Sequence, residues 1–437
     1  MNKADSERLE SALGQMGLSS TGSPEDADVI VLNSCVVRQS AEDRVVGMMT
    51  SLSPIKSRDP DRVVALMGCM VGPKTASLAE RFPHADVYMR PQEYEPLIEL
   101  LGERMGIDLD GCIGPLTAKA GVTTHVPIIH GCDKFCTFCI IPYRRGREVC
   151  RPVEDIVREV RMLVERGVKE VTLLGQNVDS YGHDLPGPPD LGDLLEAVNG
   201  VDGLERIRFL TSHPNDMSDH IIDAVASLDK VCEHINLPFQ AGDDEILARM
   251  RRGYTNEDYR VLVEKIRDRI PNVTLSTDLI VGFCGETDAQ FQRTIDMVRE
   301  IGFSKVHAAA YSNRPETIAD RTMNDDVPQT EKKSRLKVIE ELQERIVTES
   351  NARLQGLTVE VLFEGRKRGK WYGRNRNDKL VFVEDVEDHT GEVVKVRVER
   401  TGPWSLQGAF AYEAISARNG HIRISTKLNP SRSPAQW

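Results

Sequence analysis

Short apolar runs alternate with amphipathic stretches through the first hundred residues. Apolar side chains recur at a spacing of about 3.6 residues over residues 3–16, which predicts a helix. Ala27–Leu32 and Arg62–Met67 are apolar runs of strand length, and helical stretches follow both of them. Weaker patterns predict a strand over 86–89 and helices over 75–81 and 94–101. This alternation predicts a small parallel α/β sheet with helices on both faces.

A longer strand–helix rhythm occupies the centre of the chain. Helical stretches separate its strands, most clearly over Pro152–Arg166, where a proline and two acidic residues mark the first turn. Six strands are too few for a closed eight-stranded barrel, so we expect a partial (β/α)6 barrel of the TIM type. The predicted strands are Val126–His130, Glu170–Leu174, Arg206–Thr211, His234–Pro238, Thr274–Val281 and Lys305–Ala310.

The last hundred residues change from helical to alternating patterning. A long charged helix is predicted over 328–353. Short alternating runs over 357–363, 379–383, 392–400 and 409–415 then predict a small antiparallel β-barrel. We therefore expect three domains, over 1–105, 118–350 and 353–417. Residues 102–125, rich in Gly and Thr, are predicted to be a linker, and the final ten or so residues a disordered tail.

Composition limits the class of protein. The 437 residues contain no apolar run of about 18 residues, and the charged N-terminus has no apolar signal segment, so we expect a cytoplasmic protein without a membrane span. Nine cysteines in such a chain favour metal binding or chemistry over disulfides. A net charge of −12 argues against non-specific nucleic-acid binding by the whole surface.

Three cysteines are spaced as a metal-binding loop directly after the first barrel strand. Cys132, Cys136 and Cys139 form a Cys-x3-Cys-x2-Cys pattern. Three thiolates can hold three irons of a [4Fe-4S] cluster and leave the fourth iron open for chemistry. A structural zinc site completed by His130 or Cys150 is the alternative that the spacing alone leaves open.

Polar residues gather where the predicted barrel strands end, which favours a catalytic cluster over a structural zinc site. His213 is expected to be a structural histidine. In the first domain, Cys35 and Cys69 also lie just past strand ends, where open sheets bind ligands, although buried structural thiols would look the same. The predicted cofactor contacts at the barrel strand ends are Gln176, Asn177, Ser212, Gln240, Thr277, Asp278 and Gly282.

A basic stretch interrupts the otherwise acidic C-terminal part. It has no acidic residue, and Trp371 and Tyr372 lie within it. Positive charge beside aromatic rings suits the backbone and bases of RNA, whereas a solvated hairpin tip is the alternative. The predicted RNA-binding residues are Arg366, Lys367, Arg368, Lys370, Trp371, Arg374 and Arg376.

Several motifs together resemble one family closely over essentially the whole chain. It is the radical S-adenosylmethionine methylthiotransferases, of the MiaB type that modifies tRNA and ends in a TRAM domain. The motifs that carry the resemblance are Ala4–Leu9, Asn33–Arg38, Gly68–Met70, the cysteine loop, Leu174–Val178 and Thr277–Phe283.

The resemblance implies both cofactors and a substrate. A radical-generating [4Fe-4S] cluster on Cys132, Cys136 and Cys139 would bind S-adenosylmethionine at its open iron and yield a 5′-deoxyadenosyl radical. A second [4Fe-4S] cluster in the N-terminal domain, held by Cys35, Cys69 and a third cysteine, would carry the sulfur. Two S-adenosylmethionine molecules would be used to methylthiolate carbon-2 of a prenylated (isopentenyl) adenosine beside the anticodon. A monomer served by a reductant such as flavodoxin or ferredoxin is expected.

The chain departs from the family pattern at two positions. Family members carry the third cysteine directly ahead of the residues that match Met1-Asn2, so we expect that the start site is assigned too late. Cys284 stands where the family usually has proline. The rival substrates are threonylcarbamoyl-adenosine in tRNA and a ribosomal-protein aspartate, and the Asn33–Arg38 motif favours the prenylated base. A non-catalytic, zinc-containing RNA-binding protein is the rival from another class.

Overall fold

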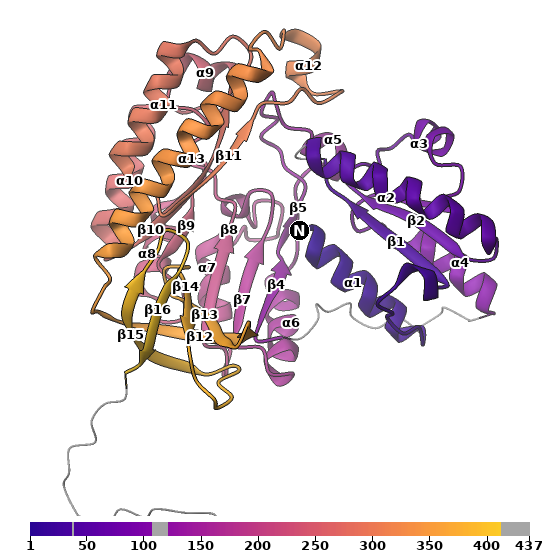
Figure 1. Cartoon of the computed structure of the whole chain (residues 1–437), viewed down its shortest axis with the longest axis horizontal. Helices are drawn as coiled ribbons and strands as arrows, with labels where there is room; N and C mark the ends of the chain where they lie inside the picture. The colour runs from indigo at the N-terminus through magenta and orange to yellow at the C-terminus, as the bar shows by residue number, and fades with distance from the viewer. Residues whose placement is uncertain (37–38, 107–120, 412–437) are drawn as a thin grey trace, which may run out of the picture.

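The computed structural model describes residues 1–36, 39–106 and 121–411, arranged in three parts (Figure 1). Cys112, most of the predicted linker and the predicted tail lie outside the described residues. The predicted bounds of the linker, 102 and 125, are wrong, because helix α4 (Glu95–Met105) and strand β4 (Thr123–Pro127) extend into it. No described helix is long and apolar enough to cross a membrane.

The N-terminal part is a parallel sheet of three strands in the order β1-β2-β3. Side chains of β2 alternate between the two faces of this sheet: Val64 and Leu66 pack in one apolar core and Val63, Ala65 and Met67 in another. Helices cover both faces, as the pattern predicts. The elements are α1 (Asn2–Gln15), η1 (Pro24–Asp26), β1 (Val29–Ser34), α2 (Gln39–Arg58), β2 (Val63–Gly68), α3 (Ala76–Arg81), β3 (Val87–Met89) and α4.

The central part is the predicted six-stranded arc of parallel strands. It comprises the sheets β4-β7-β8 and β9-β10-β11, and a parallel bridge from Ile207 to Val231 joins them. Its strands are β4, β7 (Glu170–Leu174), β8 (Arg206–Leu210), β9 (His234–Asn236), β10 (Thr274–Val281) and β11 (Lys305–Ala310).

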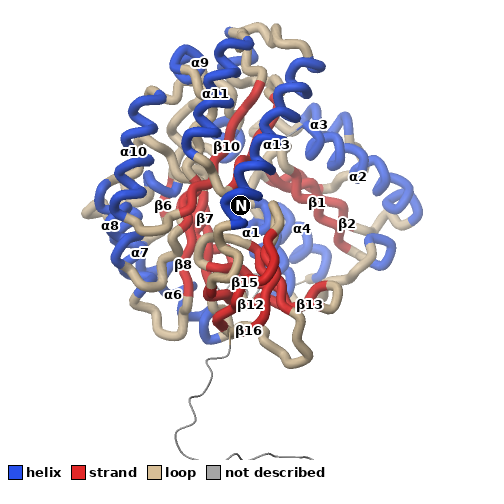
Figure 2. Tube along the Cα trace, turned by 60° about the vertical axis from the view of Figure 1, so that its left-hand side comes forward, coloured by secondary structure: helices blue, strands red, loops and turns tan. Residues whose placement is uncertain are grey.

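Helices pack around the arc and bury its apolar side chains in one large core (Figure 2). They are α6 (Val153–Glu165), η2 (Val178–Ser180), α7 (Leu191–Asn199), α8 (Asp219–Ser227), α9 (Asp244–Arg249), α10 (Asn256–Arg269), α11 (Asp288–Ile301), α12 (Ile318–Thr322) and α13 (Gln329–Ala352).

The first predicted barrel strand is split in two. Strand β4 ends at Pro127, and Ile129–His130 form β5, which pairs antiparallel with β6 (Val149–Cys150) outside the arc. The short helix α5 (Ile141–Arg145) lies between β5 and β6. The cysteine loop is therefore closed at its base by a two-stranded pairing.

The C-terminal part is a closed barrel in the order β12-β13-β14-β16-β15. Two predictions are wrong here: the basic stretch contains a strand of its own, β13, and the last described strand begins at Leu406, ahead of the predicted 409. Residues 412–415 of the predicted strand lie outside the described residues. In β13 the buried Trp371, Gly373 and Asn375 alternate with more exposed polar residues, so charge masks the strand pattern. The strands are β12 (Thr358–Lys367), β13 (Lys370–Asn375), β14 (Leu380–Val383), β15 (Val393–Thr401) and β16 (Leu406–Phe410).

Buried arginines fix this barrel to the amino ends of the central strands. Arg206 donates to the carbonyl oxygen of Arg374 at 2.7 Å. Arg208 donates to the carbonyl oxygens of Asn375 at 2.7 Å and Arg376 at 2.8 Å, and pairs with the buried Glu170 at 3.0 Å. The barrel lies at the end of the strands opposite the cysteine loop (Figure 1).

Replacing Arg208 with alanine should loosen this junction. The change leaves the Glu170 carboxylate buried without its partner and orphans two carbonyl groups, so we expect a loss of about 3–5 kcal/mol in unfolding free energy. Urea unfolding followed by tryptophan fluorescence measures it, since Trp371 and Trp404 lie in the C-terminal part. The control is Arg269→Ala, which breaks exposed ion pairs between helices. Equal losses in the two variants would contradict this assignment.

Candidate metal and cofactor site

The cysteine loop is held in one conformation at its base. Gly131 follows β5 with a φ of +69°, and a Cβ atom there would lie 2.0 Å from the carbonyl oxygen of Arg147, so only glycine fits. The amide of Cys132 donates to the carbonyl oxygen of Gly146 at 3.2 Å. The start of the loop, at Gly131 and Cys132, is therefore held against the Gly146–Arg147 segment that follows α5.

Side chains of the loop also anchor it to the mouth of the barrel. Lys134 donates to Asp216 at 2.6 Å, and Asn177, just after β7, donates to the other oxygen of the same carboxylate at 2.6 Å. On the other side, the hydroxyl of Thr137 donates to the carbonyl oxygen of Arg249 at 2.8 Å. The loop thus spans from the ends of β7 and β8 to the turn after α9.

The three thiols of the loop lie close enough to influence one another's ionisation. Burial raises the pKa of Cys132 and of Cys139 to about 12, and the neighbouring cysteines add to the effect. The thiols of Cys132 and Cys139 are therefore protonated in the metal-free loop, and a metal would displace their protons on binding. Cys136, also buried, accepts a hydrogen bond from Arg252 at 3.2 Å.

The two proposed zinc ligands outside the loop have other surroundings. The Cys150 sulfur accepts a hydrogen bond from the Gly182 amide at 3.1 Å, on the β7 side. Burial lowers the pKa of His130 to about 4, and the charges of Arg8 and Asp5 of α1 also act on it. The geometry therefore favours three thiolates with an open metal position over a four-ligand zinc site.

Buried polar atoms without a partner lie just past the ends of β7 and β8. Gln176 Oε1 and Asn177 Oδ1 follow β7, His213 Nε2 follows β8, and all three lack a hydrogen-bond partner within the described residues. Unpaired buried polar atoms are costly, and a polar ligand satisfies them. This donor and acceptor set, beside three thiols, fits S-adenosylmethionine and an iron–sulfur cluster. His213, expected to be a satisfied structural residue, is one of the residues with an unpaired atom.

The predicted cofactor contacts separate into two groups. Thr277 is engaged within the barrel, since its hydroxyl donates to the Leu237 carbonyl and accepts from the Phe239 amide. Gly282 is needed for packing on α13, because a Cβ there would lie 2.4 Å from Lys332. Both residues thus have protein neighbours in the structure, and their cofactor contacts stay predictions. Gln176, Asn177, Ser212, Gln240 and Asp278 remain predictions at the strand ends.

Asp179, which is not among the predicted contacts, lies beside His213 at the end of β8. Its carboxyl group is 5% exposed and accepts a hydrogen bond from the His213 amide at 3.0 Å. Burial raises its pKa to about 7. A carboxyl group that can change protonation near neutral pH therefore lies between the ends of β7 and β8.

Cys35 and Cys69 come together at the carboxyl edge of the N-terminal sheet. The β1–β2 register pairs Ser34 with Gly68, so the two cysteines follow side by side. Burial raises the pKa of Cys69, and the positive charge of Arg145 acts against that rise. Arg145 also pairs with the buried Asp5 at 2.8 Å. Arg145 belongs to α5, so one side chain links the cysteine loop to this second pair of thiols.

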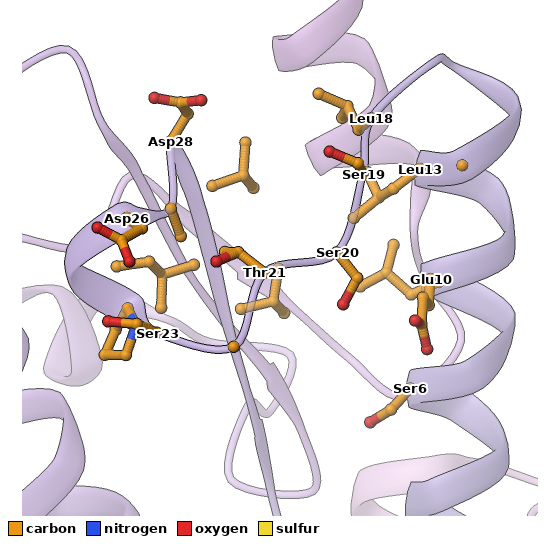
Figure 3. Close-up of a pocket in the computed structure, with 18 of the residues that line it drawn as sticks. Ser6, Glu10, Leu13, Leu18, Ser19, Ser20, Thr21, Ser23, Asp26 and Asp28 are labelled. Carbon is orange, nitrogen blue, oxygen red and sulfur yellow. The ribbon is translucent and has the colours of Figure 1, made fainter. Parts of the chain in front are cut away.

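A groove of about 700 Å³ runs beside β1, which is an edge strand (Figure 3). Side chains of α1, among them Leu13, line one wall, and the segment from Leu18 to Asp28 lines the other. The edge of β1 in this groove is unpaired in the described sheet, and an unpaired edge can accept a further strand.

The basic stretch is less available to RNA than predicted. Trp371 is 5% exposed and packs in the barrel core, so it does not offer a stacking surface. Arg376 pairs with Glu233 of the central part at 2.7 Å, and Lys370 with Glu384 at 2.8 Å. Arg374 contacts Asp378 at 3.3 Å. The exposed basic residues of the stretch are Arg366, Lys367 and Arg368, at the β12–β13 turn.

Family models match each of the three parts. The Radical SAM superfamily matches residues 126–298, the Uncharacterized protein family UPF0004 matches 1–90, and the TRAM domain matches 352–411. Among solved structures, the radical S-adenosylmethionine methyltransferase TsrM from Kitasatospora setae has the same fold at 15% identity, with a TM-score of 0.54 over 79% of this chain and 69% of that one.

Close relatives cover nearly the whole chain. The tRNA-2-methylthio-N(6)-dimethylallyladenosine synthase of Roseiflexus sp. is 50% identical over 98% of this chain and 92% of its own length. The protein of that name from Chloroflexus aurantiacus is 49% identical over 97% of this chain and 93% of its own. The chain therefore belongs to the tRNA-2-methylthio-N(6)-dimethylallyladenosine synthase family.

Proposed function

We propose that this protein is a radical S-adenosylmethionine methylthiotransferase that modifies carbon-2 of an isopentenyl-adenosine beside the anticodon of tRNA. The observation that carries the proposal is the loop of three thiols fixed at a barrel mouth lined by unpaired polar atoms. The names of the close relatives favour this substrate over threonylcarbamoyl-adenosine and over a ribosomal-protein aspartate.

The chain's own residues have distinct tasks in this reaction. Cys132, Cys136 and Cys139 would hold the radical cluster, which together with bound S-adenosylmethionine supplies the hydrogen-abstracting chemistry. Gln176, Asn177 and the neighbouring strand ends would orient the cofactor through the polar atoms that now lack partners. The buried barrel interior excludes water from the site, which protects a reactive species from side reactions.

A second [4Fe-4S] cluster at Cys35 and Cys69 is the proposed carrier of sulfur. Two thiols do not complete a three-thiolate set, so a third thiolate must join them at the carboxyl edge of the sheet. The free edge of β1 and its groove (Figure 3) can take a strand parallel to β1, and such a strand would end beside these two cysteines. Arg145 supplies positive charge there.

The remaining partners follow from charge and fold. The exposed Arg366, Lys367 and Arg368 on the TRAM barrel are proposed to contact phosphates of tRNA, because phosphate contacts require exposed positive charge more than buried aromatic rings. A one-electron donor such as flavodoxin or ferredoxin would reduce the radical cluster. We propose a monomer that acts in the cytoplasm.

Loss of one loop thiol should abolish the radical cluster and the activity. After anaerobic reconstitution, we expect the wild-type loop to bind about four irons with acid-labile sulfide, and Cys132→Ser to lose them. Formation of methylthio-adenosine on prenylated tRNA, measured by mass spectrometry of nucleosides, should disappear with the irons. Cys150→Ser is the matched control, because Cys150 is buried nearby and bonds elsewhere. Zinc in place of iron, or activity on unprenylated tRNA alone, would contradict the proposal.

A second cluster at Cys35 and Cys69 should add iron beyond that of the loop cluster. After anaerobic reconstitution, we expect Cys69→Ser to lower the iron and acid-labile sulfide content and to leave the loop cluster intact. Iron analysis and electron paramagnetic resonance measure both. An iron content that Cys69→Ser leaves unchanged would refute the second cluster.

Removing the exposed basic residues should weaken tRNA binding without harming the barrel. The double change Lys367→Ala and Arg368→Ala should lower tRNA affinity several-fold and reduce the slope of log affinity against log salt by about two, because each side chain is expected to neutralise one phosphate. Filter binding over a range of salt concentrations measures both. Lys337→Ala, an exposed charge change on α13, should have no effect. An unchanged salt slope in the double variant would exclude these residues from the interface.

A further inference from the structure

One buried arginine touches the cysteine loop directly. Arg252 follows α9 and is 5% exposed. Its guanidinium donates to Cys136 Sγ at 3.2 Å, to the Pro238 carbonyl at 3.2 Å and to the Tyr254 hydroxyl at 3.1 Å. Each of the three guanidinium nitrogens therefore has a hydrogen-bond acceptor, and one of these acceptors is a thiol of the cysteine loop.

Arg252 differs from the other buried arginines in having no carboxylate partner among the described residues. Each of the others pairs with an acidic side chain: Arg206 with Glu360, Arg208 with Glu170, Arg314 with Glu42 and Arg335 with Glu286. A buried charge without a counter-charge is strongly destabilising. Of the three groups that Arg252 contacts, the Cys136 sulfur is the one that becomes negatively charged when it binds a metal, as a thiolate.

We propose that Arg252 is the counter-charge of the loop cluster and that it raises the cluster's reduction potential. This inference rests on the proposed function, since it takes Cys136 to be a cluster ligand. The electron comes from a one-electron donor, a flavoprotein in the cell or dithionite in the test; it adds one negative charge to the cluster, and the donor is oxidised by one electron. A fixed cation beside a ligand sulfur stabilises the more negative state, and hydrogen bonds to sulfur are known levers on such potentials.

The surroundings of Arg252 hold its charge at a fixed distance. The Tyr254 hydroxyl is itself bound to the Phe239 carbonyl at 2.9 Å, so it cannot swing away with the guanidinium. The Tyr254 ring also lies edge-on to His213, one of the residues with an unpaired atom at the mouth. The planar fork matches these three acceptors, whereas a lysine has a single point of charge and cannot reach them all.

A merely structural role for Arg252 predicts something different. An arginine that only tied the loop to the turn after α9 would stabilise the protein equally with and without the cluster. It would leave the potential of an assembled cluster unchanged. A counter-charge instead acts on the loaded state and has little or no benefit in the metal-free state, where Cys136 bears no metal. The two roles can therefore be separated by measurement.

The direct test is a redox titration of the reconstituted full chain with dithionite, followed by electron paramagnetic resonance of the reduced cluster. At a fixed potential we expect Arg252→Gln to lower the ratio of reduced to oxidised cluster about tenfold, which is a shift of about 59 mV for one electron. Arg252→Lys should lower it less, because it keeps the charge. Arg251→Gln, an exposed neighbour, is the control and should match the wild type. An Arg252→Gln cluster with the wild-type potential would overturn the proposal.

A second measurement covers the case in which Arg252→Gln does not keep its cluster. Arg252→Lys keeps the positive charge, so it should then still assemble the loop cluster on reconstitution where Arg252→Gln does not. Loss of the cluster to the same extent in both variants would show a structural tie and overturn the proposal. If the wild type itself bound no iron, the proposed function would fail. If the wild type bound its cluster and the Arg252→Gln cluster had the same reduction potential, this inference alone would be refuted.

Discussion

The fixation of the cysteine loop at the barrel mouth is the constraint on which the rest of the site depends. The segment that carries the three thiols has no regular secondary structure to hold it, so its position comes from its two ends and its side chains. The β5–β6 pairing and Gly131 hold the base, and the Lys134–Asp216–Asn177 chain ties the loop to two strand ends. Only a loop so held can present three sulfurs to one metal centre while the strand ends face the open position.

Buried arginines join the three parts to this loop. Arg145 reaches from α5 to Asp5 and Cys69, and so links the loop to the second thiol pair. Arg208 fixes the TRAM barrel at the far end of the same strands. Arg252 brings positive charge to the loop itself. Planar guanidinium groups suit these junctions, because each can satisfy several acceptors at once where lysine would leave some unpaired.

Apolar periodicity was sufficient for most of the fold, since the six central strands and the N-terminal βα units are buried and follow simple patterns. Cysteine spacing likewise identified the loop, because ligands to one metal must be near in sequence or held by a turn. The sequence pattern does not predict strand β13, because charged residues occupy its outward positions. The same charged residues predict Trp371 as an RNA contact, although the period of two in this strand turns its ring inward.

Contacts between distant segments were beyond the reach of such patterns. Nothing in the local sequence distinguishes Arg252 from Arg251, yet one is buried against Cys136 and the other is exposed. The same holds for Arg145 and Asp5, which meet only when the two domains pack. Thr277 and Gly282 lie in a strand-end motif, but their roles depend on neighbours far along the chain.

The central claim is that the loop of three thiols forms a cluster whose open iron binds S-adenosylmethionine. Electron paramagnetic resonance of the reduced, reconstituted protein with and without S-adenosylmethionine tests it most directly. The account predicts a [4Fe-4S] signal that depends on Cys132, Cys136 and Cys139 and changes shape when the cofactor is added. A signal that S-adenosylmethionine leaves unchanged, or no iron signal at all, would contradict it.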